Sequence, residues 1–148
     1  MTAEQQSLIH SLISRTLNDT LKSEYFTDIA EKNAVIYYVG NFDGIAITYI
    51  TKYGFLLDIL AVENPRNGTG SMLFDHVVAK SEGRVFCRSQ PFRGYKNWYE
   101  KRTDIVKTFP NVEDTLYDHF FKGMSQSQIT GACELFKEKK SNYGSRAY

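Results

Sequence analysis

An apolar run that ends in a glycine turn is the feature that most constrains the fold of this chain. Residues 56–62 are apolar except for Asp58 and predict a buried strand, and residues 71–80 have the periodicity of a helix. Pro65, Gly68 and Gly70 lie between them and predict a tight turn. This order places backbone N–H groups and a helix N-terminus where they can meet a phosphate. Gly68-Thr69-Gly70 alone is also compatible with an ordinary surface turn.

The segments before this turn predict two helices and a β-hairpin. Apolar residues recur at helical intervals over residues 3–17, and Ser23 is the expected N-cap of a shorter helix. Glycine, asparagine and aspartate at residues 40–44 predict a hairpin loop. The expected elements cover residues 3–17, 23–32, 34–39 and 45–51.

The segments after the turn predict three more helices and three more strands. They cover residues 71–80, 84–88, 96–102, 105–109, 115–121 and 125–140. A helical crossover predicts that strand 84–88 pairs in parallel with strand 56–62. The order predicts an α/β fold with a mixed, largely antiparallel central sheet flanked by helices. We expect one domain over residues 1–124, with a C-terminal helix and a frayed tail over residues 125–148.

Composition argues against several classes of partner. A net charge of +1 and a pI near 7.7 argue against a nucleic-acid surface. No apolar run approaches the roughly 18 residues needed to cross a bilayer, and the N-terminus lacks the basic character of a targeting segment. We therefore expect a soluble protein of the cytoplasm or the mitochondrial matrix. Cys87 and Cys133 lack metal-ligand spacing, and reduced thiols are a simpler interpretation than one disulfide. No metal site is expected.

Several motifs occur in an order that resembles a known superfamily. Residues 40–47 form a glycine-acidic-glycine hairpin, and Gly68-Thr69-Gly70 follows the central strand. Arg88-Ser89, Asn97-Trp98-Tyr99 and Arg102 follow the next strand, and Gly123 lies near the end of the match. Over about residues 7–124 the chain resembles the GCN5-related N-acetyltransferases. Within them it looks most like the C-terminal acetyltransferase domain of N-acetylglutamate synthases and of some acetylglutamate kinases.

This resemblance implies a donor, an acceptor and roles for individual residues. The donor would be acetyl-CoA, and the acceptor the α-amine of L-glutamate or a related amino acid in arginine biosynthesis. Tyr99 matches the acid that protonates the departing thiolate, and Arg88 matches an arginine that holds the acceptor's carboxylate. Asn97 and Arg93 are further candidates for acceptor contacts. The expected coenzyme residues are Leu60, Ala61, Val62, Asn67, Gly68, Thr69, Gly70 and Ser71. The resemblance also implies a possible amino-acid kinase partner domain and a homodimer.

The match departs from the family pattern where the acceptor would bind. Leu56, Ile59 and Leu60 replace a tyrosine, a lysine and a phenylalanine of the family pattern, and Gln90 replaces its second arginine. Losing a charged contact to a buried carboxylate costs about 2–5 kcal/mol. The alternative to an enzyme is therefore a regulatory domain that keeps the fold without turnover. Likewise, Arg88 could pair with a nearby acid, and Tyr99 could simply fill the core.

Overall fold

The computed structural model describes residues 1–144 and contains helices and one six-stranded sheet. The helices are α1 (Ala3–Leu17), α2 (Tyr25–Glu31), α3 (Thr69–Lys80), α4 (Lys96–Glu100), α5 (Gln126–Glu138) and a 3-10 turn, η1 (Pro91–Arg93). The strands are β1 (Val35–Val39), β2 (Gly44–Ile50), β3 (Phe55–Val62), β4 (Val85–Ser89), β5 (Ile105–Pro110) and β6 (Leu116–Lys122).

The strands form a sheet in the order β1-β2-β3-β4-β6-β5. β3 and β4 pair in parallel, whereas the pairs β1–β2, β4–β6 and β5–β6 are antiparallel. The predicted mixed, largely antiparallel sheet is therefore confirmed, together with the parallel pairing across the α3 crossover.

The chain divides into two compact units, and each is described by itself. The first comprises residues 1–49, 58–77 and those from Asn142 on, and the second comprises residues 50–57 and 78–141. The division falls inside β3 and inside α3, so both units contain part of each element.

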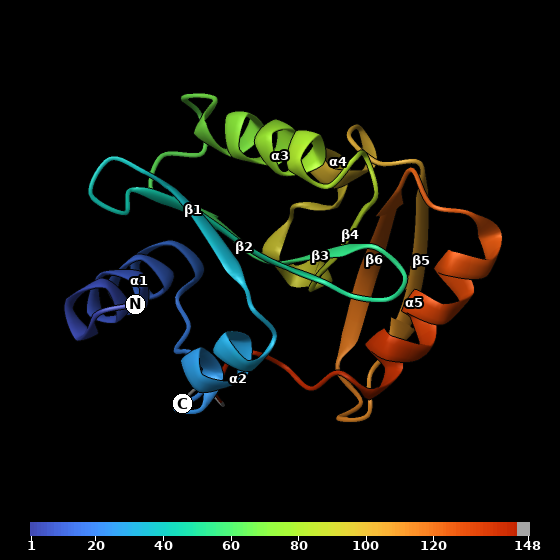
Figure 1. The fold of residues 1–148 in the computed structure, drawn as a ribbon, viewed down its shortest axis with the longest axis horizontal. Helices are drawn as coiled ribbons and strands as arrows, with labels where there is room; N and C mark the ends of the chain where they lie inside the picture. Colours follow the sequence, from blue (N-terminus) through green and yellow to red (C-terminus); the bar gives the residue numbers. More distant parts are fainter. Residues whose placement is uncertain (145–148) are drawn as a thin grey trace. The chain divides into compact units, whose positions relative to one another are not determined.

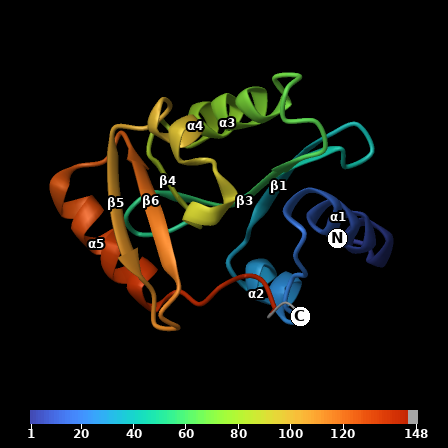
Figure 2. The same ribbon diagram turned by 180° about the vertical axis from the view of Figure 1, so that it is seen from behind.

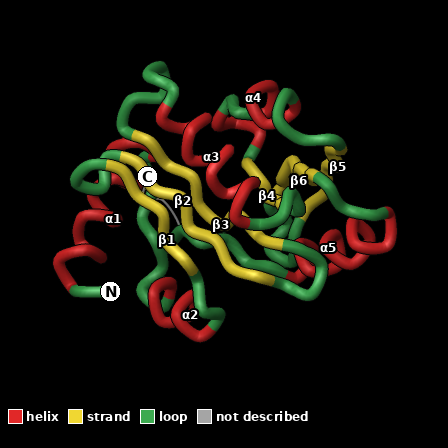
Figure 3. The backbone as a smooth tube through the Cα atoms, turned by 45° about the horizontal axis from the view of Figure 1, so that its top comes forward, coloured by secondary structure: helices red, strands yellow, loops and turns green. Residues whose placement is uncertain are grey.

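In the first unit, helices cover both faces of the strands β1 to β3 (Figure 3). On one face, the Tyr37 ring of β1 meets the His76 ring of α3 edge-on, with centroids 4.8 Å apart. On the other face, α1 buries Ile9, Leu12 and Ile13. The Thr2 hydroxyl and the Gln5 side chain form a capping box that fixes the start of α1.

In the second unit, α5 lies along the strands β5 and β6, as both ribbon views show (Figures 1 and 2). Phe136 of α5 is fully buried, and its ring centroid lies 5.2 Å from that of Phe86 and 4.7 Å from that of His119. A capping box of Ser125 and Gln128 fixes the start of this helix. Aromatic packing on one helix face therefore joins α5 to the sheet.

The structure corrects two predicted helix starts. Ser23 is not the N-cap of α2, because its hydroxyl donates to the Glu24 carboxylate and α2 begins at Tyr25. α3 begins at Thr69 rather than residue 71, so part of the predicted glycine turn is helical. Helix α4 is shorter than predicted and ends at Glu100.

The segment after α5 is more ordered than a frayed tail as far as Gly144. The Gly144 N–H donates to the Thr20 carbonyl at 2.7 Å, and Tyr143 forms an isolated bridge with Leu21. The remainder of the predicted frayed tail, residues 145–148, lies outside the described residues. α5 belongs to the second unit, so neither unit follows the predicted boundary after Met124, which stays a prediction.

Within residues 1–144, no helix combines the length and the apolar character that crossing a membrane requires.

Candidate active site

The predicted coenzyme residues all fall in the first unit, at the end of β3 and in the turn that leads into α3. The Glu63 N–H donates to the Asp43 carbonyl of the β1–β2 loop at 2.8 Å. This bond holds the chain where it leaves β3. The backbone of Leu60, Ala61 and Val62 forms the last part of the strand before that point.

Two asparagines shape the turn itself. Asn64 Oδ1 accepts from the Arg66 N–H at 3.1 Å. Asn67 Oδ1 accepts from the Thr69 N–H at 3.1 Å and from the Thr69 hydroxyl at 2.6 Å. Such contacts hold a loop in place at the start of a helix. Asn67 therefore satisfies the first N–H of α3.

Gly68 is the point of this turn that needs glycine. Its φ is +82°, and a Cβ added there would meet no atom within 4 Å. A phosphate oxygen can approach such an uncovered backbone closely. The next N–H groups, of Gly70 and Ser71, lie in the first turn of α3, where the helix itself supplies no acceptor. The turn therefore fits a pyrophosphate.

Gly44 lets the β1–β2 hairpin support the start of α3. A Cβ added at Gly44 would lie 3.0 Å from Thr69 Cγ2 and 3.3 Å from Leu73 Cδ1. This tight packing needs a residue without a side chain, so the hairpin can lie against the start of α3 only with glycine at this position.

β3 and β4 pair only over a short stretch. Their ladder, within the described residues, joins Phe55 to Val85 and Leu56 to Phe86. β3 then continues to Val62 and β4 to Ser89. The ladder thus involves the N-terminal ends of both strands.

The predicted acid and acceptor residues all fall in the second unit. The guanidinium of Arg88 lies against the residues that follow α5. Its Nη1 donates to the Lys139 carbonyl at 2.9 Å, and its Nη2 donates to the Lys140 carbonyl at 2.8 Å. Its guanidinium carbon lies 4.0 Å from the centroid of the Tyr117 ring. A carboxylate at Arg88 would therefore have to replace two main-chain carbonyls.

Tyr99 is buried with 8% of its surface exposed. Its ring stacks on Phe120 at 4.9 Å and meets the Trp98 ring edge-on at 5.0 Å. The Tyr99 carbonyl accepts from the Thr103 hydroxyl at 2.7 Å, which braces the end of α4. This packing fixes the ring, whichever role the hydroxyl has.

The remaining acceptor candidates lie close to Tyr99 in sequence. Asn97 is exposed on α4. Arg93 Nη2 donates to Gln90 Oε1 at 3.3 Å, and its guanidinium lies 4.9 Å from the Phe92 ring centroid. Arg93 is thus already paired with the glutamine that replaces the family's second arginine.

Arg88 and Tyr99 belong to opposite faces of the sheet in the second unit. Directly opposite residues of an antiparallel pair share a face, and Arg88 is opposite His119 whereas Cys87 is opposite Phe120. Tyr99 stacks on Phe120, on the face away from Arg88. A ligand could touch both Arg88 and Tyr99 only if it passed from one face of the sheet to the other around the end of a strand.

Two of the departures from the family pattern are buried apolar residues. Leu56 is 1% exposed and Ile59 is 3% exposed, so both fill the core of their units. Neither side chain could bind a carboxylate.

A polar cluster on β3 was not singled out from the sequence. The Tyr25 hydroxyl donates to Asp58 Oδ2 at 2.7 Å, and Asn142 Nδ2 donates to Asp58 Oδ1 at 3.1 Å. Burial, followed by the charge of Asp58, raises the pKa of Tyr25 well above its ordinary value. The only signal in the sequence is one aspartate inside an apolar strand.

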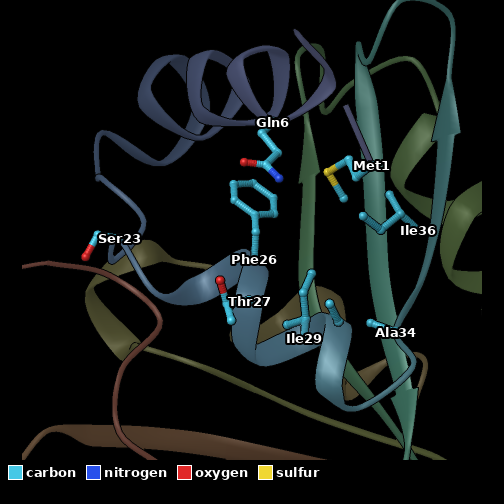
Figure 4. Close-up of a pocket in the computed structure, with 9 residues that line it drawn as sticks. Met1, Gln6, Ser23, Phe26, Thr27, Ile29, Ala34 and Ile36 are labelled. Atoms are coloured by element: carbon cyan, nitrogen blue, oxygen red, sulfur yellow. The ribbon is translucent and has the colours of Figure 1, made fainter. Parts of the chain in front are cut away.

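A cavity of about 460 Å³ lies between α1, α2 and β1 in the first unit (Figure 4). Apolar Phe26, Ile29 and Ile36 line it together with the uncharged polar side chains of Gln6 and Thr27. Ile36 lies on the face of β1 opposite Tyr37, which contacts α3. The cavity is therefore on the other side of the strands from the coenzyme turn.

Both cysteines are free and buried. Burial raises the pKa of the Cys87 thiol far above its ordinary value and raises that of Cys133 as well. Neither is set up as a nucleophile. Among residues 1–144, no three His, Cys, Asp or Glu side chains come together as a group that could hold a metal.

The fold defined by these elements is shared with a known acetyltransferase. The ribosomal-protein-S18-alanine N-acetyltransferase from Escherichia coli superposes with a TM-score of 0.62, over 84% of this chain and 92% of that chain, at 13% identity. An acetyltransferase from Bacillus cereus matches at 17% identity over 69% of this chain and 90% of that chain, with a TM-score of 0.45. No protein-family model and no curated protein matches the sequence. The first comparison shows a shared fold, which confirms the fold expected from the resemblance.

His119 of β6 lies opposite Arg88 of β4 and has a shifted pKa. It is fully buried, stacks on Phe109 with ring centroids 3.8 Å apart, and has its Nδ1 3.1 Å from the Lys107 carbonyl. Burial lowers its pKa from 6.5 to about 4, the charge of Arg88 adds to this, and the Lys107 carbonyl and Asp118 oppose it. The folded protein therefore favours the neutral imidazole.

We predict that His119 makes the protein less stable in acid. Between pH 6.5 and about 4 the unfolded chain binds a proton that the folded chain excludes, so stability is lost as pH falls through this window. The loss attributable to His119 should reach about 3 kcal/mol near pH 4. Urea denaturation of the wild type and of His119→Phe from pH 7 to pH 4 measures it, because the carboxylates contribute alike to both. Parallel stability curves for the two proteins would contradict the prediction.

Proposed function

We propose that this protein transfers an acetyl group from acetyl-CoA to the amine of a small acceptor. The observation that carries the proposal is the turn at the start of α3, where Gly68 has an uncovered backbone and a φ of +82°. The fold shared with an N-acetyltransferase supports it.

Residues of the first unit would hold the donor. The backbone of Leu60, Ala61 and Val62 would hydrogen-bond the pantetheine arm as another strand would, since the β4 ladder ends at Leu56. N–H groups at Gly68, Gly70 and Ser71 would bind the pyrophosphate, and the dipole of α3 would stabilise it by about 0.3–1 kcal/mol per charge. Asn67 and Thr69 would keep the turn in shape rather than bind the ligand.

The reaction needs one nucleophile and one acid. The amine nitrogen attacks the thioester carbon, the carbon–sulfur bond breaks, and the thiolate leaves with the bonding electron pair. Tyr99 would donate its hydroxyl proton to that thiolate, the acetylated nitrogen would lose its extra proton to solvent, and solvent would return a proton to the Tyr99 oxygen. The stacking of Tyr99 on Phe120 would fix the hydroxyl for this step.

For the acceptor we propose glutamate or a related amino acid. Arg88 would bind its carboxylate in a bidentate manner, with Asn97 and Arg93 as further contacts. The proposal for this residue set comes from the resemblance. A homodimer and an attached amino-acid kinase domain, in an arginine-biosynthesis enzyme, belong to the same proposal.

A regulatory domain without turnover is the second candidate. Two observations favour it: Leu56 and Ile59 are buried where the family has polar side chains, and the guanidinium of Arg88 already binds the end of α5. Such a domain could still bind acetyl-CoA. A panel of amino acids assayed with acetyl-CoA separates the two, because a regulatory domain would turn over none of them.

We predict that Gly68→Ala weakens acetyl-CoA binding by at least about tenfold, because the new methyl group would stand where the pyrophosphate approaches the backbone. Gly83→Ala is the matched control, since Gly83 has a φ of +80° and equally open surroundings. Both variants should lose about 1–2 kcal/mol of stability from the strained backbone. Calorimetric titration measures the affinities, and equal affinities in the two variants would exclude the turn as the binding site.

We predict that Tyr99→Phe lowers kcat by about 10²–10⁴-fold while leaving acetyl-CoA affinity within about twofold of the wild type. The phenylalanine ring keeps the stacking on Phe120, so a loss of folding would not explain the change. The assay follows thiol release from acetyl-CoA with glutamate and with other amino acids. An unchanged kcat would remove Tyr99 from the mechanism.

A further inference from the structure

The segment directly after α5 lies across the guanidinium of Arg88. We call residues 139–141 the strap. Arg88 donates to the Lys139 and Lys140 carbonyls, and Asn111 Nδ2 donates to the Lys139 carbonyl at 3.0 Å. The Ser141 N–H donates to Glu113 Oε1 at 2.8 Å. All of these contacts lie within the second unit.

The two carbonyl oxygens occupy the fork of Arg88 as the two oxygens of a carboxylate would. One terminal nitrogen binds each oxygen, at 2.9 Å and 2.8 Å. This is the bidentate arrangement in which arginine binds carboxylates. The strap therefore takes up the donors that an anionic ligand of Arg88 would need.

Aromatic rings hold Arg88 independently of the strap. Its guanidinium carbon lies 4.0 Å from the Tyr117 ring centroid and 5.6 Å from that of Phe136. Cation–π contacts of this kind keep a guanidinium in position. If the strap moved away, the fork would stay oriented and would expose two donors.

We propose that the strap is an autoinhibitory contact, displaced from Arg88 by the carboxylate of an acceptor. This inference rests on the proposed function, because it assigns to Arg88 the acceptor carboxylate named there. A carboxylate adds charge–charge attraction to its two hydrogen bonds with the guanidinium, which a neutral carbonyl lacks, so it can compete. The hydrogen bonds of Asn111 and Glu113 to the strap stabilise the closed state and so determine how strongly it resists displacement by the carboxylate.

The closed strap lowers the apparent affinity for the carboxylate. A ligand that binds only the open state has its affinity reduced by the fraction of protein that is open. Loosening the strap at a residue that does not touch the ligand should therefore tighten binding. Glu113 is such a residue, because its carboxylate accepts from the strap N–H at Ser141.

The test uses the full chain, L-glutamate as the probe and no acetyl-CoA. Calorimetry compares the wild type with Glu113→Ala, which removes the acceptor, and Glu113→Gln, which removes the charge but keeps an oxygen acceptor. Glu134→Gln, on the exposed part of α5, controls for a distant change of charge. Hydrogen exchange of the Ser141 amide, with and without saturating glutamate, follows the strap directly.

We expect glutamate to accelerate exchange at Ser141 and Glu113→Ala to bind glutamate about tenfold more tightly than Glu113→Gln. Equal affinities of these two variants, or unchanged exchange at Ser141 in the glutamate-bound protein, would overturn the proposal that the strap is autoinhibitory. Failure of all variants to bind glutamate would overturn it too. Strap movement without any acetyl transfer would instead count against the proposed enzyme alone, so the two proposals can fail separately.

Discussion

The short parallel ladder between β3 and β4 is the constraint on which the rest of the structure depends. Parallel neighbours cannot be joined by a tight hairpin, so the chain must leave β3, form α3 and return to β4. That crossover brings a helix N-terminus to the end of a buried strand. Among residues 1–144 the ladder joins two residue pairs, so most of the β3 backbone continues beyond its pairing with β4. The proposed phosphate turn and the proposed strand segment for a coenzyme both follow from this one connection.

The local pattern of residues was enough to predict most elements. The apolar stripe of α1 has the period of a helix, and the β-branched, aromatic run of β1 is typical of a strand. Both elements therefore form as predicted. α3 starts earlier than predicted because Asn67 caps the helix from inside a stretch that has the composition of a turn. The prediction of Ser23 as an N-cap is wrong because α2 begins at Tyr25, and the Ser23 hydroxyl donates to the carboxylate of the neighbouring Glu24.

The candidate site was harder to predict than the fold. The conformation and openness of Gly68 agree with its predicted role, because a glycine turn after a strand is a local signal. The surroundings of Arg88 depend on the strap that follows α5, far along the chain, because the Lys139 and Lys140 carbonyls occupy its fork. Such long-range contacts leave no local pattern. The apolar residues at positions 56 and 59 depart from the family pattern where the acceptor is expected to bind. Both side chains are buried, which agrees with that departure.

The proposed donor half depends on the backbone of the first unit, and the proposed acceptor half depends on side chains of the second unit. The most direct test of the central claim is a titration of the isotope-labelled protein with acetyl-CoA, followed by amide chemical shifts. The account predicts the largest shifts at Gly68, Gly70 and Ser71. Shifts confined to the cavity lined by Phe26 and Ile36, or no shifts at all, would contradict it.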